Sequence, residues 1–144
     1  MDHVAEQVDP FRSYILSFVK SKNTTPEITL RKALFARGYR YYIHDKSLPG
    51  TPDIVFPRKR IVIFVNGCFW HRHDCGRANM PKVRVSYWER KFENTLRRDA
   101  RNHEQLKSLG WTVLIVWECE ILEDLESSLQ VIIRQIERQR KKQE

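Results

Sequence analysis

The chain has 144 residues, of which 41% are hydrophobic and 31% charged, and its formal net charge is +8 with a pI near 9.6. This composition excludes a disordered chain, no apolar run reaches the length of a membrane span, and no signal-peptide core precedes the first helix. Three cysteines in such a chain favour metal binding or free thiols over a disulfide framework. We therefore expect one cytoplasmic domain over residues 1–144, with nucleic acid favoured as a polyanionic partner.

The first predicted element is a helix over Thr25–Arg37. Thr24 and Glu27 have the spacing of a capping box. Pro26 is typical of a first helical turn, and Gly38 is typical of the position just after a helix.

Two short strands are predicted next. The segment "SLPGTPDIVF" indicates a Pro/Gly turn that places Asp53 at the start of an apolar strand. The run "IVIFV", Ile61–Val65, predicts a second, buried strand. The short polar turn between them favours a hairpin.

The second half of the chain predicts a helix from about Val85 to Leu109, a buried strand over Trp111–Cys119 and a closing amphipathic helix over Leu125–Ile136. One side of the long helix carries Trp88, Phe92, Leu96, His103 and Leu106. Residues 139–144 are expected to form a solvated tail. This order of elements predicts an α/β fold in which helices flank a mixed central sheet.

Four residues suggest a metal site. Cys68, His73 and Cys75 fall in one loop, and Cys119 ends a distant predicted strand. Three thiolates and one imidazole suit a tetrahedral zinc ion, although small buried cysteines also occur near strand ends without a metal. His71 is left over, either as a solvated loop residue or as a general acid or base.

A second site is suggested where the two hairpin strands meet. Asp53 starts one strand and Val65 lies at the end of the next, so a carboxylate and backbone carbonyls come together there. Such oxygen atoms can hold Mg²⁺, which supports phosphodiester hydrolysis. The alternatives are a turn-capping role for Asp53 and a capping role for Glu27 beside Thr24.

Aromatic and cationic residues alternate in the loop and on the long helix. Phe69 and Trp70 stand in a polar loop, and Trp88 opens a helix whose polar face includes Lys91. This combination is typical of side chains that wedge into a duplex while cations contact phosphates. Ordinary packing is the alternative for Trp88.

The segments "SLPGTPD", "IVIFVNGCFWHRHDC", "YWERKFENTLRRD" and "LGWTVLIVWEC" occur in an order and spacing that resemble the very short patch repair (Vsr) mismatch endonucleases. The resemblance runs from about Arg12 to Cys119. It implies a restriction-endonuclease-like fold with a structural zinc site. The implied activity is nicking of double-stranded DNA 5′ to the thymine of T:G mismatches that arise when 5-methylcytosine deaminates.

The resemblance also implies roles for individual residues. Asp53 and the carbonyl of Val65 would hold Mg²⁺, His71 would be the acid or base at the scissile phosphate, and Glu27 would be an accessory acid. The zinc ligands would be Cys68, His73, Cys75 and Cys119, and the duplex wedges would be Phe69, Trp70 and Trp88, with Leu16 from a DNA-contacting arm over residues 1–23. Independently of the resemblance, we predict that Asp99 on the long helix orients His71 by hydrogen bonding.

Association with the bacterial nucleoid and contact with other mismatch-repair proteins are further expectations. A monomer is expected because a nick needs only one active site. One residue departs from the pattern: Asn66 stands where related nucleases have lysine or histidine. Two alternatives therefore stay open. The chain could be a zinc-stabilised DNA-binding module with weak or no cleavage, or a nuclease of different specificity.

Overall fold

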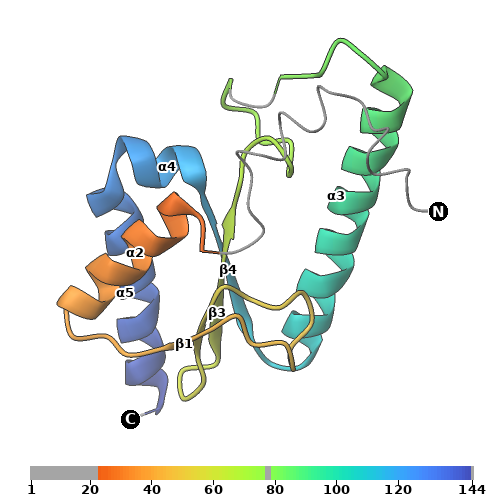
Figure 1. Ribbon diagram of the computed structural model, residues 1–144. Coiled ribbons are helices and arrows are strands. Elements are labelled where there is room, and N and C mark those ends of the chain that lie inside the picture. Colours follow the sequence, from red (N-terminus) through yellow and green to blue (C-terminus); the bar gives the residue numbers. More distant parts are fainter. Residues whose placement is uncertain (1–22, 77–78, 144) are drawn as a thin grey trace.

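The computed structural model describes residues 23–76 and 79–143, and its centre is a four-stranded mixed sheet (Figure 1). The strands are adjacent in chain order, namely β1 (Tyr42–Ile43), β2 (Ile54–Phe56), β3 (Ile61–Asn66) and β4 (Thr112–Trp117). The first three strands are antiparallel neighbours, which confirms the predicted hairpin, whereas β3 and β4 run parallel.

Helices cover both faces of this sheet, as Figure 1 shows. One face is covered by α2 (Thr25–Ala36), α4 (Glu118–Glu123) and α5 (Leu125–Gln143), and the other by α3 (Val85–Ser108). The long helix α3 is the crossover that parallel strands require between β3 and β4. The predicted α/β class with flanking helices is confirmed.

Alternating side chains of the strands form two separate cores. From β3, Ile61 and Ile63 pack toward α2 and α5, whereas Val62 and Phe64 pack toward the side of α3. This is the period of two that a strand imposes on its side chains. Because both faces are buried, β3 reads as a continuous apolar run, and its carboxyl end is held firmly where the loop of residues 67–76 begins.

The helix α2 begins as its sequence predicts. The side chain of Thr24 accepts a hydrogen bond from the Glu27 amide at 3.3 Å, and Pro26 lies in the first turn. The Glu27 carboxylate accepts a bond from the amide of Asn23, one residue earlier than in a capping box. These bonds fix Glu27 at the start of the helix. Its carboxylate also contacts the side chains of Arg31 and His44.

The structure corrects three local expectations. Strand β4 ends at Trp117, and Cys119 lies in the first turn of α4, which was not predicted. The Glu120 carboxylate accepts the Trp117 amide and so supports a helix start where the sequence suggested more strand. On α3, Trp88, Phe92 and Leu106 are buried as predicted, but Leu96 is 46% exposed and Thr95 is buried in its place.

Two further features concern the ends of the predicted elements. The backbone of α5 stays helical to Gln143, through most of the segment expected as a tail. Strand β1, of two residues, was not predicted at all.

Among the described residues, no helix is long and apolar enough to cross a membrane.

Candidate active site and metal centre

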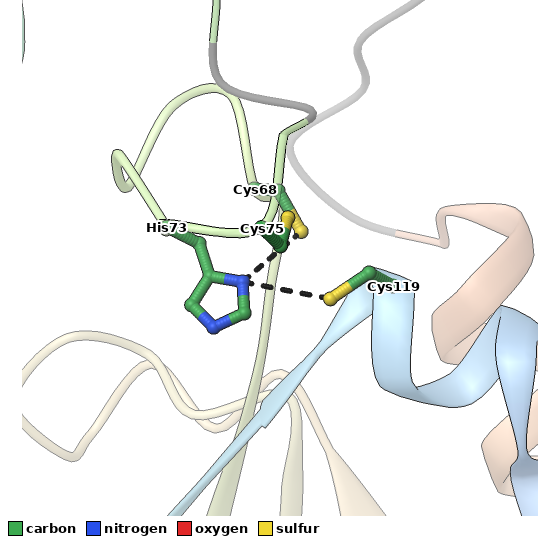
Figure 2. A group of neighbouring side chains, drawn as sticks. All are labelled: Cys68, His73, Cys75 and Cys119. Carbon is green, nitrogen blue, oxygen red and sulfur yellow. Dashed lines mark hydrogen bonds between the residues drawn. The ribbon is translucent and has the colours of Figure 1, made fainter.

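The four predicted Cys/His residues meet at one point. The ligand atoms of Cys68, His73, Cys75 and Cys119 all lie within 4.8 Å of one another (Figure 2). The Nδ1 atom of His73 is 3.7 Å from the Cys68 sulfur and 3.5 Å from the Cys119 sulfur. In a tetrahedral zinc site, the usual bond lengths put nitrogen and sulfur ligands about 3.5 Å apart. The cluster therefore fits a metal ion, with the donor set that zinc prefers.

Surrounding groups hold this cluster in place. The Cys68 amide donates to the Glu118 carboxylate at 2.9 Å, and the His73 ring stacks on Trp117 with centroids 4.0 Å apart. Burial raises the pKa of the Cys68 thiol to about 12, and burial also raises the pKa of Cys119. A bound cation would favour the thiolates instead, because metal binding displaces thiol protons.

His71 lies in the same loop, outside the cluster. Its Nδ1 atom is 2.5 Å from a carboxylate oxygen of Asp99 on α3. An ionised carboxylate only accepts, so the His71 ring donates from Nδ1 and its Nε2 atom is the remaining proton-exchange position. The two side chains are about one-quarter exposed, which leaves the imidazole accessible to a substrate. The expected contact between His71 and Asp99 is present.

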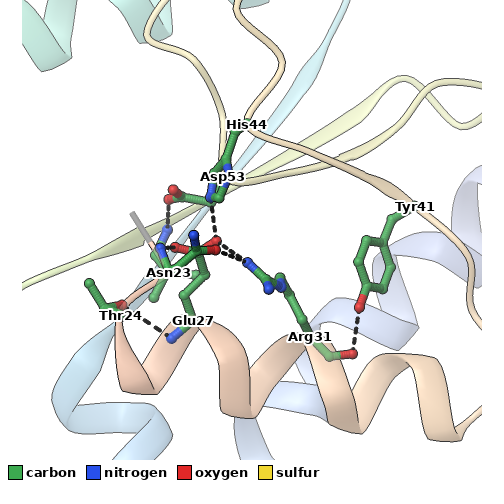
Figure 3. A network of polar contacts seen from close by, with 8 residues as sticks. Asn23, Thr24, Glu27, Arg31, Tyr41, His44 and Asp53 are labelled. Carbon is green, nitrogen blue, oxygen red and sulfur yellow. Dashed lines mark hydrogen bonds and ion pairs between the residues drawn. The ribbon is translucent and has the colours of Figure 1, made fainter. Parts of the chain in front are cut away.

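A second group of titratable side chains, Glu27, His44 and Asp53, comes together where α2 approaches the start of β2 (Figure 3). Glu27 is 1% exposed. Its carboxylate accepts a hydrogen bond from the Arg31 guanidinium at 2.7 Å and lies 2.6 Å from His44 Nε2. The ligand atoms of Glu27, His44 and Asp53 all lie within 4.8 Å of one another. The described chain thus contains a second group of side chains that could hold a cation.

Asp53 is held by the end of β3. The Val65 amide donates to the Asp53 carboxylate at 2.8 Å, and the Asp53 amide donates to the Ile63 carbonyl at 3.1 Å. Because the N–H and C=O of a strand residue point to the same side, the Val65 carbonyl also faces this site. The carboxylate and carbonyl expected to hold Mg²⁺ are therefore neighbours.

The electrostatics of Asp53 indicate that its negative charge lacks compensation. Burial raises the pKa of Asp53 to about 6, and the nearby Glu27 carboxylate raises it further. The Val65 hydrogen bond and the nearby His44 and His71 act in the opposite direction. A carboxylate in this situation is stabilised by a cation, as a metal ligand would be.

A single cleft of about 1110 Å³ connects these groups. Its lining includes Glu27, His44, Asp53, Val65, Asn66, Phe69, Trp70, His71 and Asp99. Lys46 and Arg98 add cations to its walls. Titratable groups that converge in one concave site with a perturbed pKa are typical of an active site.

Aromatic residues pack edge-on or at a tilt against one another beside the cleft. Phe69 and Trp70 are half-buried, with ring centroids 5.3 Å apart, and both contact Trp88 at 5.8 Å. Trp88 is completely buried, so in this conformation it supports the loop aromatics from α3. Trp88 is therefore a packed residue in this conformation, as the alternative to a wedge role predicts. Phe69 and Trp70, by contrast, line the cleft.

The remaining predicted residues are dispersed. Lys91 is exposed on α3, away from the cleft lining, and Asn66 is 7% exposed at the end of β3. Leu16 lies outside the described residues. His44 was missed by the sequence reasoning, although the run "YYI" before it is typical of a strand that would pair with β2 and bring residue 44 beside Asp53.

Comparison with known proteins decides the family. The family model described as "DNA mismatch endonuclease Vsr" matches residues 6–77. The DNA mismatch endonuclease Vsr of Escherichia coli is 40% identical over 110 residues, which are 76% of this chain and 70% of the relative. The chain belongs to the Vsr family of DNA mismatch endonucleases.

Two type II nicking enzymes are also similar to the chain. The type II nicking enzyme V.XorIIP of Xanthomonas oryzae pv. oryzae is 48% identical over 124 residues, 85% of this chain and 91% of the relative. The type II nicking enzyme V.NmeAIP of Neisseria meningitidis is 40% identical over 110 residues, 76% of this chain and 79% of the relative. As a Vsr-family protein, the chain is an enzyme of the DNA endonuclease class, and DNA is its substrate.

Proposed function

We propose that this protein nicks double-stranded DNA on the 5′ side of the thymine in T:G mismatches and so initiates very short patch repair. The observation that carries the proposal is the convergence of Asp53 and the His71–Asp99 pair on one cleft that is also lined by the half-buried Phe69 and Trp70. Phosphodiester hydrolysis needs charge stabilisation and proton transfer at the same phosphate. The names of the relatives, a mismatch endonuclease and nicking enzymes, agree with this activity.

Asp53 and the Val65 carbonyl would hold Mg²⁺, and Glu27 would act beside them as an accessory acid. Mg²⁺, when bound there, supplies positive charge that stabilises the phosphate during hydrolysis. His71 would exchange a proton through Nε2, because Asp99 engages Nδ1 and fixes the ring. Zinc at the Cys/His cluster would keep His71 and the adjacent aromatics in a fixed position.

Phe69 and Trp70 would enter the duplex at the mismatch. Insertion costs a few kcal/mol of lost base stacking, and the cost is lowest at a weakened base pair. Trp88 and Phe92, which are both buried beneath them, would resist displacement of the wedge. Cations on α3, Lys91 and Arg98 among them, would contact phosphates and set the register.

The test is a nicking assay with Mg²⁺ on a labelled T:G duplex, with a matched C:G duplex and the Asp53→Ala variant beside it. A nick adjacent to the thymine, in the mismatched duplex only and absent with the variant, supports the proposal. Cleavage of both duplexes would contradict the mismatch specificity. Tight mismatch binding without any nick would favour a binding module, in which Asn66 marks a site that has lost its cationic residue.

A further inference from the structure

His44 occupies a position that the proposed activity has not yet used. It follows β1, and its amide donates to the Asp53 carbonyl at 3.2 Å, so pairing of β1 with β2 places it at the cleft. Its φ of 49° lies in the left-handed region, which non-glycine residues adopt infrequently. The backbone is thus held in an uncommon conformation that directs the ring toward Glu27.

The distances around His44 match a coordination shell. Ligands bound to one cation at about 2.1 Å lie about 3–4 Å from one another. The ligand atoms of His44, Glu27 and Asp53 lie within 4.8 Å of one another, and His44 Nε2 is 2.6 Å from Glu27. Small side-chain rotations would therefore let all three atoms reach one ion.

The need to neutralise the Glu27 charge does not by itself explain why His44 lies in the cleft. The Glu27 carboxylate already receives the Arg31 guanidinium at 2.7 Å and the Asn23 amide at 2.9 Å. By contrast, Asp53 accepts the Val65 amide and has no ion pair with a Lys or Arg of the described chain. The group in need of a cation is Asp53, and the imidazole faces the space between the two carboxylates.

We propose that His44 is a nitrogen ligand of the catalytic cation, which it binds together with Asp53 and Glu27. This inference rests on the cation site of the proposed function and adds His44 to its ligands, with Glu27 then binding the cation directly instead of acting beside it. Mg²⁺ prefers oxygen ligands, whereas Mn²⁺ and the later divalent ions accept imidazole as well. The mixed set of two carboxylates and one imidazole therefore favours Mn²⁺ over Mg²⁺.

The test measures cation binding to the zinc-loaded protein without DNA. Titration calorimetry with Mn²⁺ and with Mg²⁺ compares the wild type with His44→Gln. A glutamine amide can still donate to Glu27, so it preserves a positioning role but removes the imidazole ligand. We expect His44→Gln to lower the Mn²⁺ affinity about 10-fold and to change the Mg²⁺ affinity less than about 2-fold.

Pulsed electron paramagnetic resonance of bound Mn²⁺ gives a direct readout. We expect coupling to a directly bound imidazole nitrogen in the wild type and its loss in His44→Gln. His103→Gln is the matched control, because His103 also lines the cleft but packs at a tilt against Phe64, with ring centroids 4.9 Å apart. It should retain the coupling and both affinities.

Two results separate this inference from the proposed function. If Mn²⁺ binding disappears in Asp53→Asn but the wild type lacks nitrogen coupling, His44 is not a ligand and the cation site of the proposed function stands. If Asp53→Asn binds both ions as the wild type does, the proposed cation site itself is wrong. The wild-type spectrum decides the role of His44 even if His44→Gln fails to fold.

Discussion

At the scale of single residues, Asp53 is both the proposed cation ligand and a source of instability. Its carboxylate is half-buried beside the end of β3 and lies close to the Glu27 carboxylate, and this partial burial and the neighbouring charge raise its pKa from 3.8 to about 6. The native protein therefore binds more protons than the unfolded chain between these two pH values. The free energy of unfolding of the metal-free protein therefore falls as pH rises through this window, and it stays lower above it.

We predict that Asp53→Asn stabilises the protein in magnesium-free buffer. Asn keeps an oxygen that can accept a hydrogen bond from the Val65 amide, and it removes the half-buried charge. At pH 8 the free energy of unfolding should rise by up to about 3 kcal/mol, and at pH 4 the gain should vanish because Asp53 is then protonated in the native state. Urea unfolding at the two pH values measures this. An equal effect at both would show that the charge of Asp53 has no part in it.

A second prediction concerns the His71–Asp99 pair. Asp99→Asn should reduce the nicking rate by about 10²-fold or more, because the amide no longer fixes and stabilises the His71 ring. Binding of a T:G duplex in the absence of Mg²⁺ should change little, and zinc content should stay at one equivalent. Single-turnover nicking and a binding titration separate these effects. Unchanged nicking would exclude Asp99 as a positioning residue.

At the scale of elements, the loop of residues 67–76 and helix α3 form one unit. The loop brings Phe69 and Trp70 onto Trp88 and Phe92, and the guanidinium of Arg72 lies 4.0 Å from the centre of the Phe92 ring. Aromatic pairs in such edge-on geometry contribute about 1 kcal/mol each beyond burial. The side chains proposed as the wedge are thus preorganised by contacts within the protein itself.

We predict that Trp70→Ala reduces discrimination between T:G and matched duplexes more than it reduces general DNA affinity. The exposed part of the indole would act only where bases separate easily, whereas phosphate contacts on α3 act on any duplex. Competition binding with the two duplexes measures the ratio. Phe35→Ala is the control, since Phe35 is 53% exposed on α2 and absent from the cleft lining. Equal losses on both duplexes would contradict the wedge role.

At the scale of the whole molecule, the Cys/His cluster joins the loop after β3 to the start of α4. Cys119→Ala should remove zinc and lower the free energy of unfolding by several kcal/mol, because structural zinc binding is coupled to folding. Zinc analysis and urea unfolding check this. Leu122→Ala, at a 49% exposed position of the same helix, should cost far less and retain the metal. Full zinc content in Cys119→Ala would contradict the assigned ligands.

Much of this architecture was predictable because local patterns and tertiary packing agree. The apolar runs of β2 and β3, the Thr24 cap and the cysteine spacing all predicted what the structure contains. Helix α4 was missed because "WECEI" alternates apolar and polar residues as a strand does, whereas Glu120 caps a helix there. Whether a helix begins depended on one hydrogen bond that periodicity does not encode.

The candidate site was predictable in part for a different reason. Asp53, His71 and the cysteines stand in dense motifs, whereas His44 is a single histidine 17 residues from Glu27. Only the pairing of a two-residue strand with β2 brings it to the cleft. For Trp88, the local sequence favoured a wedge as much as packing. Its burial in this conformation depends on the loop that folds over it, which the local sequence does not show.

The Cys/His cluster has a further consequence for how the chain reaches its native state. His73 and Cys119 are separated by 46 residues, which include all of α3 and β4. A cross-link that closes a loop of this length restricts the unfolded chain by an amount worth about 4 kcal/mol on the loop-entropy model. The ligands meet only after β4 has paired with β3, since that pairing places Cys119 beside the loop. Metal uptake is therefore expected late in folding, and a newly made chain short of zinc would hold a formed sheet beside an open loop of residues 67–76.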